Sequence, residues 1–162
     1  MKKILLIRHA KSSWEHDIED IDRPLSTRGF SDANLLSNEF LKSDFIPDKI
    51  FSSPANRALT TCKIFMKNLN YDDSRLTITD QLYDFGGSQV ANFIHHLDNR
   101  FENVMIFGHN HAFTSIANSF GSQYIDNVPT CGLVMLHFEN VSWKEIKKGT
   151  TELTLFPRDL KS

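Results

Sequence analysis

Short apolar runs alternate with amphipathic stretches along this chain, and this alternation constrains its fold more than any other feature. The stretches between the runs carry apolar residues at helical spacing, as helices that pack against a sheet do. Strands that alternate with helices form parallel sheets covered on both faces. We therefore predict an α/β fold with a doubly wound, mostly parallel sheet flanked by helices. Its strands are expected at residues 4–7, 49–52, 76–78 and 103–107, with two more peripheral ones at 132–138 and 152–156.

Helix boundaries follow from capping residues. Ser26 is the predicted N-cap of a helix over residues 27–42. Ser53 is expected to cap a second helix, with Pro54 at its first position. Apolar residues at helical spacing predict which face of each helix packs against the sheet. They are Ala33, Leu36, Phe40 and Leu41 in the first helix, Leu59, Cys62, Met66 and Leu69 in the second, and Val90, Phe93, Ile94 and Leu97 in a third.

Composition is that of an ordinary globular chain, and 162 residues suit a single domain over 1–162. The formal charge is −2 and no run of Lys or Arg exceeds two residues, so we expect no nucleic-acid partner. No apolar stretch approaches the roughly 18 residues of a membrane span, so no membrane partner is expected. Cys62 and Cys131 stand far apart, which suggests neither a zinc site nor a disulfide. A cytoplasmic location is the default expectation.

Polar residues follow three of the predicted strands at their carboxyl ends. Arg8 and His9 follow the first, Ser52 to Arg57 the second, and Gly108-His109 the strand at 103–107. In doubly wound sheets such ends converge on one crevice. Arg holds phosphate bidentately, and a neutral His can attack phosphorus. Taken singly, Arg57 is equally compatible with a solvated surface residue, and His109 with a structural histidine.

The remaining polar residues include possible metal ligands and possible general acids. His9, His95, His96, His109 and His111 lack carboxylates at ligand spacing, so we predict neither a metal nor a cofactor. A general acid would protonate the leaving group. The candidates, each also explicable as an ordinary solvated carboxylate, are Asp80 and Asp84 after the third strand and Asp17, Glu19, Asp20 and Asp22 in the loop over 9–25.

Four ordered motifs resemble those of the histidine phosphatase, or phosphoglycerate-mutase-like, superfamily. They are Leu6-Ile7-Arg8-His9-Ala10, Arg23-Pro24-Leu25-Ser26-x-Arg28-Gly29, Ser52-Ser53-Pro54-x-x-Arg57-Ala58-x-x-Thr61 and Gly108-His109-Asn110. Within the superfamily, Arg-His-Ala-Lys-Ser-x-Trp and the short chain are similar to the SixA-type phosphohistidine phosphatases. The resemblance implies a minimal version of the fold, without the large helical insertion of the mutases.

The resemblance also implies roles for individual residues. His9 would be the nucleophile that becomes phosphorylated, with Arg8, Arg57 and His109 holding the phosphoryl group. Ser12 would line the entrance to the site. The acid of larger members lies in a Leu-x-Glu segment, for which Leu82-Tyr83-Asp84 is the nearest match, so Asp84 is the candidate acid.

The expected activity is metal-independent hydrolysis of a phosphoryl group through phospho-His9. The expected substrate is phosphohistidine in a protein, such as a phosphohistidine carrier domain. The alternative is a phosphomonoesterase for a small phosphorylated metabolite, with Asp84 as acid. A non-catalytic phosphate-binding module is a third possibility. Glu15 stands near the place of an Asn found in the mutases, which argues against phosphoglycerate as substrate.

Overall fold

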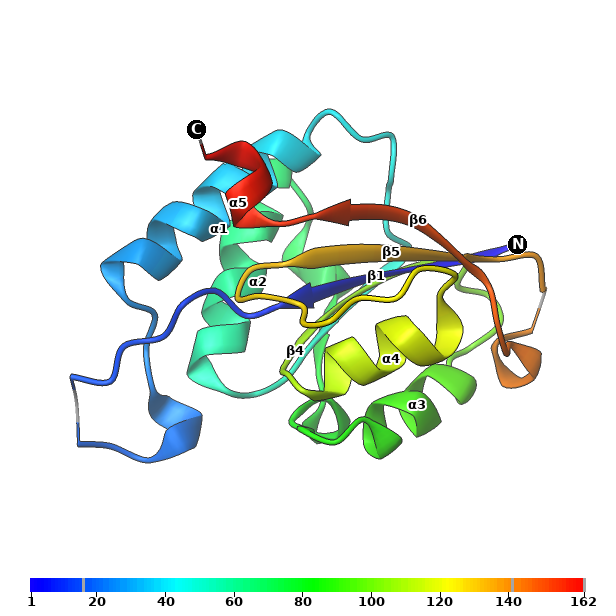
Figure 1. Ribbon diagram of the computed structural model, residues 1–162, viewed down its shortest axis with the longest axis horizontal. Coiled ribbons are helices and arrows are strands. Elements are labelled where there is room, and N and C mark those ends of the chain that lie inside the picture. The colour runs from blue at the N-terminus through cyan, green and yellow to red at the C-terminus, as the bar shows by residue number, and fades with distance from the viewer. Residues whose placement is uncertain (16, 141, 162) are drawn as a thin grey trace.

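A six-stranded sheet forms the centre of the computed structural model, which describes residues 1–162 except 16, 141 and 162 (Figure 1). Its strands are β1 (Lys2–Arg8), β2 (Lys49–Ser52), β3 (Leu76–Ile78), β4 (Asn103–Gly108), β5 (Leu133–Phe138) and β6 (Thr150–Leu155). Their order across the sheet is β3-β2-β4-β1-β5-β6. The strands from β3 to β1 are parallel, whereas β5 pairs antiparallel with both β1 and β6. The predicted doubly wound, mostly parallel sheet is confirmed.

Strand β1 shows why its sequence is continuously apolar. Ile4 and Leu6 pack into the core on one face of the sheet, and Leu5 and Ile7 pack into the core on the other. A strand covered on both faces needs apolar residues at every position rather than at alternate ones. β1 also has hydrogen-bonded neighbours along both edges, β4 and β5, so it lies at the centre of the molecule.

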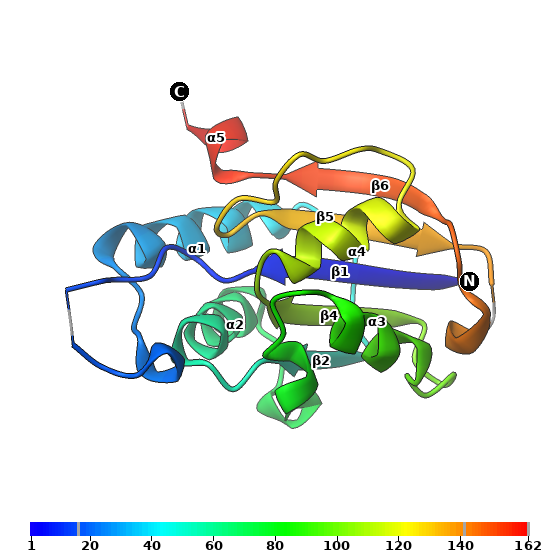
Figure 2. The ribbon, with the colours of Figure 1, turned by 60° about the horizontal axis from the view of Figure 1, so that its bottom comes forward.

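Helices cover both faces of this sheet, as Figures 1 and 2 show. One face carries α1 (Thr27–Phe40), α2 (Asn56–Leu69) and the short α5 (Pro157–Leu160), and the other carries α3 (Ser88–His95) and α4 (Ala112–Phe120). Four short 3-10 helices lie in the connections, at η1 (Asp20–Asp22), η2 (Asp73–Arg75), η3 (Asp80–Leu82) and η4 (Trp143–Glu145). Among the described residues, none of the helices is both long and apolar enough to cross a membrane.

Several boundary predictions need correction. Ser26 does cap α1, because its hydroxyl accepts the backbone N–H of Gly29 at 3.1 Å. The helix ends at Phe40, however, and Leu41, predicted to face inward, is 56% exposed. The second helix begins at Asn56 rather than Pro54, because Ser53 closes a local turn onto the N–H of Ala55.

The two late strands also differ from expectation. β5 is not peripheral, since it lies next to β1 and most of its side chains are buried. An antiparallel strand fits there because it needs no crossover helix. β6 is the edge strand of this side of the sheet, as expected for a peripheral element.

The topology places β2, β4 and β1 side by side, so their carboxyl ends share one edge of the sheet. Arg8 is in register with Gly108, and Ser52 is in register with Phe107. Backbone hydrogen bonds of 3.0 Å continue this pairing just beyond the strands, from His9 N–H to Gly108 O and from Ser53 N–H to Phe107 O. The predicted convergence of the three polar segments is therefore confirmed.

Candidate active site

His9 follows β1 directly and is buried. Its Nδ1 lies 2.7 Å from the carbonyl oxygen of Ala10. Because a carbonyl only accepts hydrogen bonds, Nδ1 carries the proton of the neutral ring, and Nε2 is left with a lone pair. Burial, together with the charges of Arg57 and Arg8, lowers the pKa of His9 to about 3, although the hydrogen bond to Ala10 opposes the shift. At neutral pH, Nε2 is therefore an available nucleophile.

Arg57 lies in the first turn of α2 and is only 2% exposed, so it is not a solvated surface residue. Its Nη1 donates to the backbone oxygen of Asp20 at 2.7 Å, and its Nη2 contacts the carboxylate of Asp20 at 3.0 Å. Arg8, at the end of β1, donates from Nη1 to the Val128 carbonyl at 2.9 Å. The Nε atoms of both arginines are buried and have no hydrogen-bond partner among the described residues.

His109 follows β4 and is fully buried. The centroid of its ring lies 5.3 Å from that of His9. Its Nε2 lies 2.9 Å from the hydroxyl of Ser53, and its Nδ1 has no hydrogen-bond partner in the part of the chain that the structure describes. Burial, followed by the charges of His9 and Arg57, lowers the pKa of His109 to about 3, so this ring is also neutral at pH 7.

Three unpartnered nitrogens thus belong to the cluster around His9: Arg8 Nε, Arg57 Nε and His109 Nδ1. Leaving a buried donor unpaired costs about 1–3 kcal/mol, so folded proteins seldom retain several together without a purpose. Two guanidinium groups and an imidazole around a nucleophilic nitrogen form a site suited to a phosphoryl dianion. The structure brings together the four residues that the sequence singled out for this task.

Asp84 has a different setting from the one expected of a proton donor. Its carboxylate accepts four backbone N–H groups at 3.0–3.2 Å, from Gly86, Gly87, Gln89 and Val90. These bonds hold the turn that begins α3. The structure thus gives Asp84 a capping role at this turn, and its assignment as general acid stays a prediction.

Asp20, one of several acids weighed in the first loop, joins the site unexpectedly. Besides Arg57, its carboxylate contacts Tyr83 Oη at 2.6 Å and Arg23 Nε at 3.3 Å. Burial raises the pKa of Asp20, but the hydrogen bonds from Tyr83 and Arg57 outweigh it and lower the pKa to about 2. Asp20 is therefore a carboxylate that positions Arg57, and at neutral pH it has no proton to donate.

Ser12 and Arg23 lie at the rim of the site. The Ser12 hydroxyl accepts a hydrogen bond from Arg23 Nη1, and Arg23 in turn stacks over Trp14, with Cζ 3.6 Å from the ring centroid. The positive charge of Arg23 contributes to the lowered pKa of His9, which places it within electrostatic reach of the nucleophile. The sequence supplied Arg23 only as part of a motif. Its contacts lie within one loop, whereas those of Tyr83 with Asp20 and of Ser53 with His109 join segments too far apart for local patterns to reveal.

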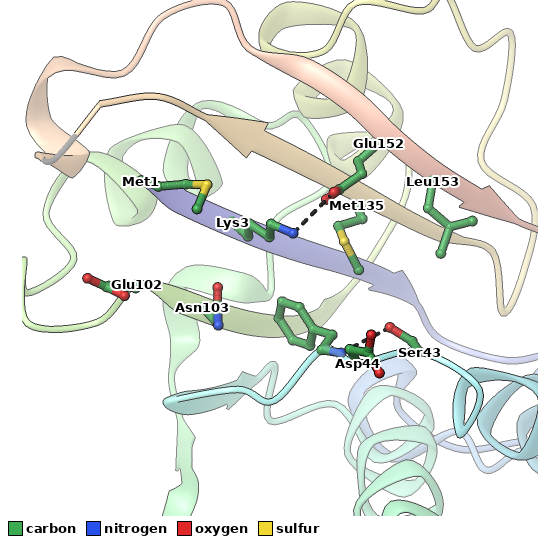
Figure 3. A pocket seen from close by; sticks show the side chains of 10 residues that line it. Met1, Lys3, Ser43, Asp44, Glu102, Asn103, Met135, Glu152 and Leu153 are labelled. Carbon is green, nitrogen blue, oxygen red and sulfur yellow. Dashed lines mark hydrogen bonds and ion pairs between the residues drawn. The ribbon is translucent and has the colours of Figure 1, made fainter.

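Other regions of the described chain lack a comparable cluster of functional side chains. In the parts of the chain that the structure describes, no three His, Cys, Asp or Glu side chains are grouped to hold a metal ion. A hollow of about 460 Å³ lies at the opposite edge of the sheet, at the start of β1 (Figure 3). An ion pair of 3.1 Å between Lys3 and Glu152 spans it. None of the residues that line it carries a buried unpaired donor, so the site at the carboxyl ends remains the candidate.

Comparison with known proteins agrees with this geometry. A model of the histidine phosphatase superfamily (branch 1) matches residues 4–88, which is more than half of the chain. The chain belongs to the histidine phosphatase superfamily. This histidine phosphatase is 26% identical over 153 residues to an uncharacterized chloroplastic protein of Arabidopsis thaliana, with 89% of this chain and 70% of that protein covered. The predictions of the family and of a phosphatase are confirmed.

Solved structures show that the fold is shared. The protein histidine phosphatase SixA complexed with tungstate matches with a TM-score of 0.82 at 19% identity, covering 98% of this chain and 99% of that chain. A protein from Agrobacterium tumefaciens, provisionally named the phosphohistidine phosphatase SixA, matches with a TM-score of 0.79 at 23% identity, covering 95% and 97%. The SixA-like, minimal version of the fold is therefore also confirmed for this histidine phosphatase.

Proposed function

We propose that this protein hydrolyses phosphohistidine in a protein substrate, with His9 as the covalent nucleophile. The observation that carries the proposal is the lone pair of His9 Nε2 in a cluster with three buried, unpartnered nitrogens, those of Arg8, Arg57 and His109. A phosphoryl group placed there would have a nucleophile at phosphorus and donors for its oxygens. Positioning and charge neutralisation of this kind account for most of the catalysis of phosphoryl transfer.

The reaction has two displacements at phosphorus. In the first, His9 Nε2 forms a bond to phosphorus while the P–N bond to the substrate imidazole breaks, and the released imidazole keeps the electron pair and takes up a proton. In the second, a water molecule attacks phospho-His9, its P–N bond breaks, and orthophosphate leaves. Arg8 and Arg57 neutralise the charge on the phosphoryl oxygens in both steps.

The carboxylates of the site support a P–N substrate over a P–O ester. An alkoxide leaving group needs a positioned acid, whereas an imidazole leaves readily once its ring is protonated. The Asp84 carboxylate accepts hydrogen bonds from four backbone N–H groups, and Asp20 has a pKa of about 2. Asp20 therefore has no proton to donate at neutral pH, and the Asp84 carboxylate is held by the backbone of the turn that begins α3.

The mouth of the site supports a macromolecular substrate. A hollow of about 520 Å³ is lined by loop residues 17–20 and Asp22, next to the contacts of Asp20 with Arg57. Trp14, on the same loop, is 74% exposed. An open rim with an exposed aromatic side chain suits a group presented on a protein surface. The fold shared with SixA proteins supports the same substrate class.

The test measures phosphate release from a phosphohistidine carrier domain and, in parallel, from an alkyl phosphate monoester. We expect fast release from the carrier, loss of release in His9→Ala, and no change in His96→Ala, because His96 is an exposed histidine remote in sequence from the site motifs. Phosphate trapped on the wild type should be acid-labile, as a P–N bond is. Fast release from the ester alone would instead establish a small-molecule phosphatase, and stoichiometric phosphate binding without turnover would establish a binding module.

A further inference from the structure

Ser53 is a fully buried residue that follows β2 and touches the candidate site from behind. Its backbone N–H is bonded to the Phe107 carbonyl at 3.0 Å, so the main chain is fixed to the sheet. Its hydroxyl oxygen accepts the N–H of Ala55 at 3.1 Å and lies 2.9 Å from His109 Nε2. A hydroxyl has one proton to donate and lone pairs to accept with.

These contacts determine the direction of the bond between Ser53 and His109. Among the described residues, His109 Nε2 is the acceptor within reach of the Ser53 proton, because the other neighbour of the hydroxyl, the Ala55 N–H, is a donor. The opposite direction would leave the Ser53 proton unpaired in a buried place. It would also turn a lone pair of His109 Nδ1 toward any anion in the site. Nε2 is therefore the acceptor, and Nδ1 carries the proton.

We propose that Ser53 is a positioning residue that holds His109 in its Nδ1–H tautomer, so that His109 donates a hydrogen bond to the phosphoryl group during transfer. The inference rests on the proposed function in one respect, the placement of the phosphoryl group between His9 and His109. The ring of His109 is packed edge-on against Tyr83, at 5.3 Å, which limits its rotation. Ser53 thus determines which nitrogen is the donor, and the packing determines where it points.

The surroundings of His109 keep its ring neutral at physiological pH, so the choice of tautomer decides which nitrogen donates. The charged and titratable groups that face it are His9 and Arg8 from β1 and its end, Arg57 from α2, Asp20 from η1 and Tyr83 after η3. Burial and the nearby positive charges favour the neutral ring. A neutral imidazole donates from one nitrogen only, whereas an imidazolium donates from both.

The first test compares Ser53→Ala with Ser52→Ala. Ser52 is equally buried and adjacent, but its hydroxyl bonds the backbone carbonyl of Ser53 rather than His109. We expect kcat/KM of Ser53→Ala to fall by about 10- to 100-fold at pH 7.5, because a catalytic donor is removed from most molecules. Ser52→Ala should stay close to wild type. A Ser53→Ala variant as active as Ser52→Ala would overturn the inference.

The second test needs no activity and so separates this inference from the proposed function. The 15N chemical shifts of the His109 ring, assigned with His109→Asn, report which nitrogen is protonated. We expect a protonated Nδ1 in the wild type and in Ser52→Ala, and a mixture of tautomers in Ser53→Ala. A protonated Nε2 in the wild type would overturn the inference even if phospho-His9 forms. The expected shifts together with no phosphatase activity would refute the proposed function while the tautomer assignment held.

Discussion

Whether Asp84 is a structural cap or a general acid can be decided by experiment. The Asp84 carboxylate accepts four backbone N–H groups, and two of these bonds, from Gly87 and Val90, are buried. Removing the carboxylate leaves two buried donors unpaired at about 1–3 kcal/mol each, and water can replace the other two bonds. We therefore expect Asp84→Ala to lower the free energy of unfolding by about 2–6 kcal/mol, equivalent to roughly 4–24 °C in Tm.

The assay pairs stability with activity. Urea unfolding gives the loss of stability, with Asp80→Ala as the control, because Asp80 is an exposed acid in the same loop. Phosphate release by the isosteric Asp84→Asn, measured well below its Tm, should fall by less than about tenfold, whereas loss of a general acid costs about 10²–10⁴-fold. A stable Asp84→Asn with activity reduced a thousandfold would refute the structural assignment and restore Asp84 as the acid.

Two other expectations follow from the same site. Arg57→Ala should raise KM and lower kcat together, with kcat/KM reduced at least about 100-fold, while the exposed Arg100→Ala stays unchanged in the same assay. The folded-state pKa values of His9 and His109, about 3, lie below the ordinary value for His. Between about pH 3 and 6.5 the unfolded chain therefore binds more protons, so stability is full above pH 6.5 and declines toward pH 3. Urea midpoints from pH 4 to 7 should show this decline, and a slope no shallower in His9→Asn would contradict its assignment to His9.

The sequence predicted the parts of this protein that depend on periodicity. The apolar run Ile4–Ile7 indicated a strand buried on both faces, and helices alternating with strands indicated a parallel sheet. Because parallel strands end at one edge, the positions of Arg8 and His109 relative to each other followed from the topology alone. The inward-facing residues of α1 also followed from helical spacing up to the last turn, whereas in α2 the fully buried Phe65 was missed and the predicted Leu59 is only partly buried.

What the sequence could not predict depends on contacts between distant segments. Ser53 meets His109, 56 positions away, and Asp20 meets Arg57, 37 positions away. Such pairs leave no local pattern, because each partner is an ordinary polar residue in its own segment. Asp84 illustrates a different limit. Its place near the site was predicted, but its role depends on four N–H groups that converge only once the turn before α3 has formed.

The central position of β1 has a consequence for local unfolding. Amide protons in β1 are hydrogen-bonded within a sheet that is covered on both faces, so their exchange with solvent should require global unfolding. The segments over 13–15 and 17–19, which include Trp14, make few such bonds, so their amide protons should exchange faster. The nucleophile therefore belongs to the slowest-exchanging unit of the protein, whereas the rim that meets the substrate belongs to a fast one. Sequence changes in that rim can alter which partner is accepted while the phosphoryl-transfer geometry stays in place.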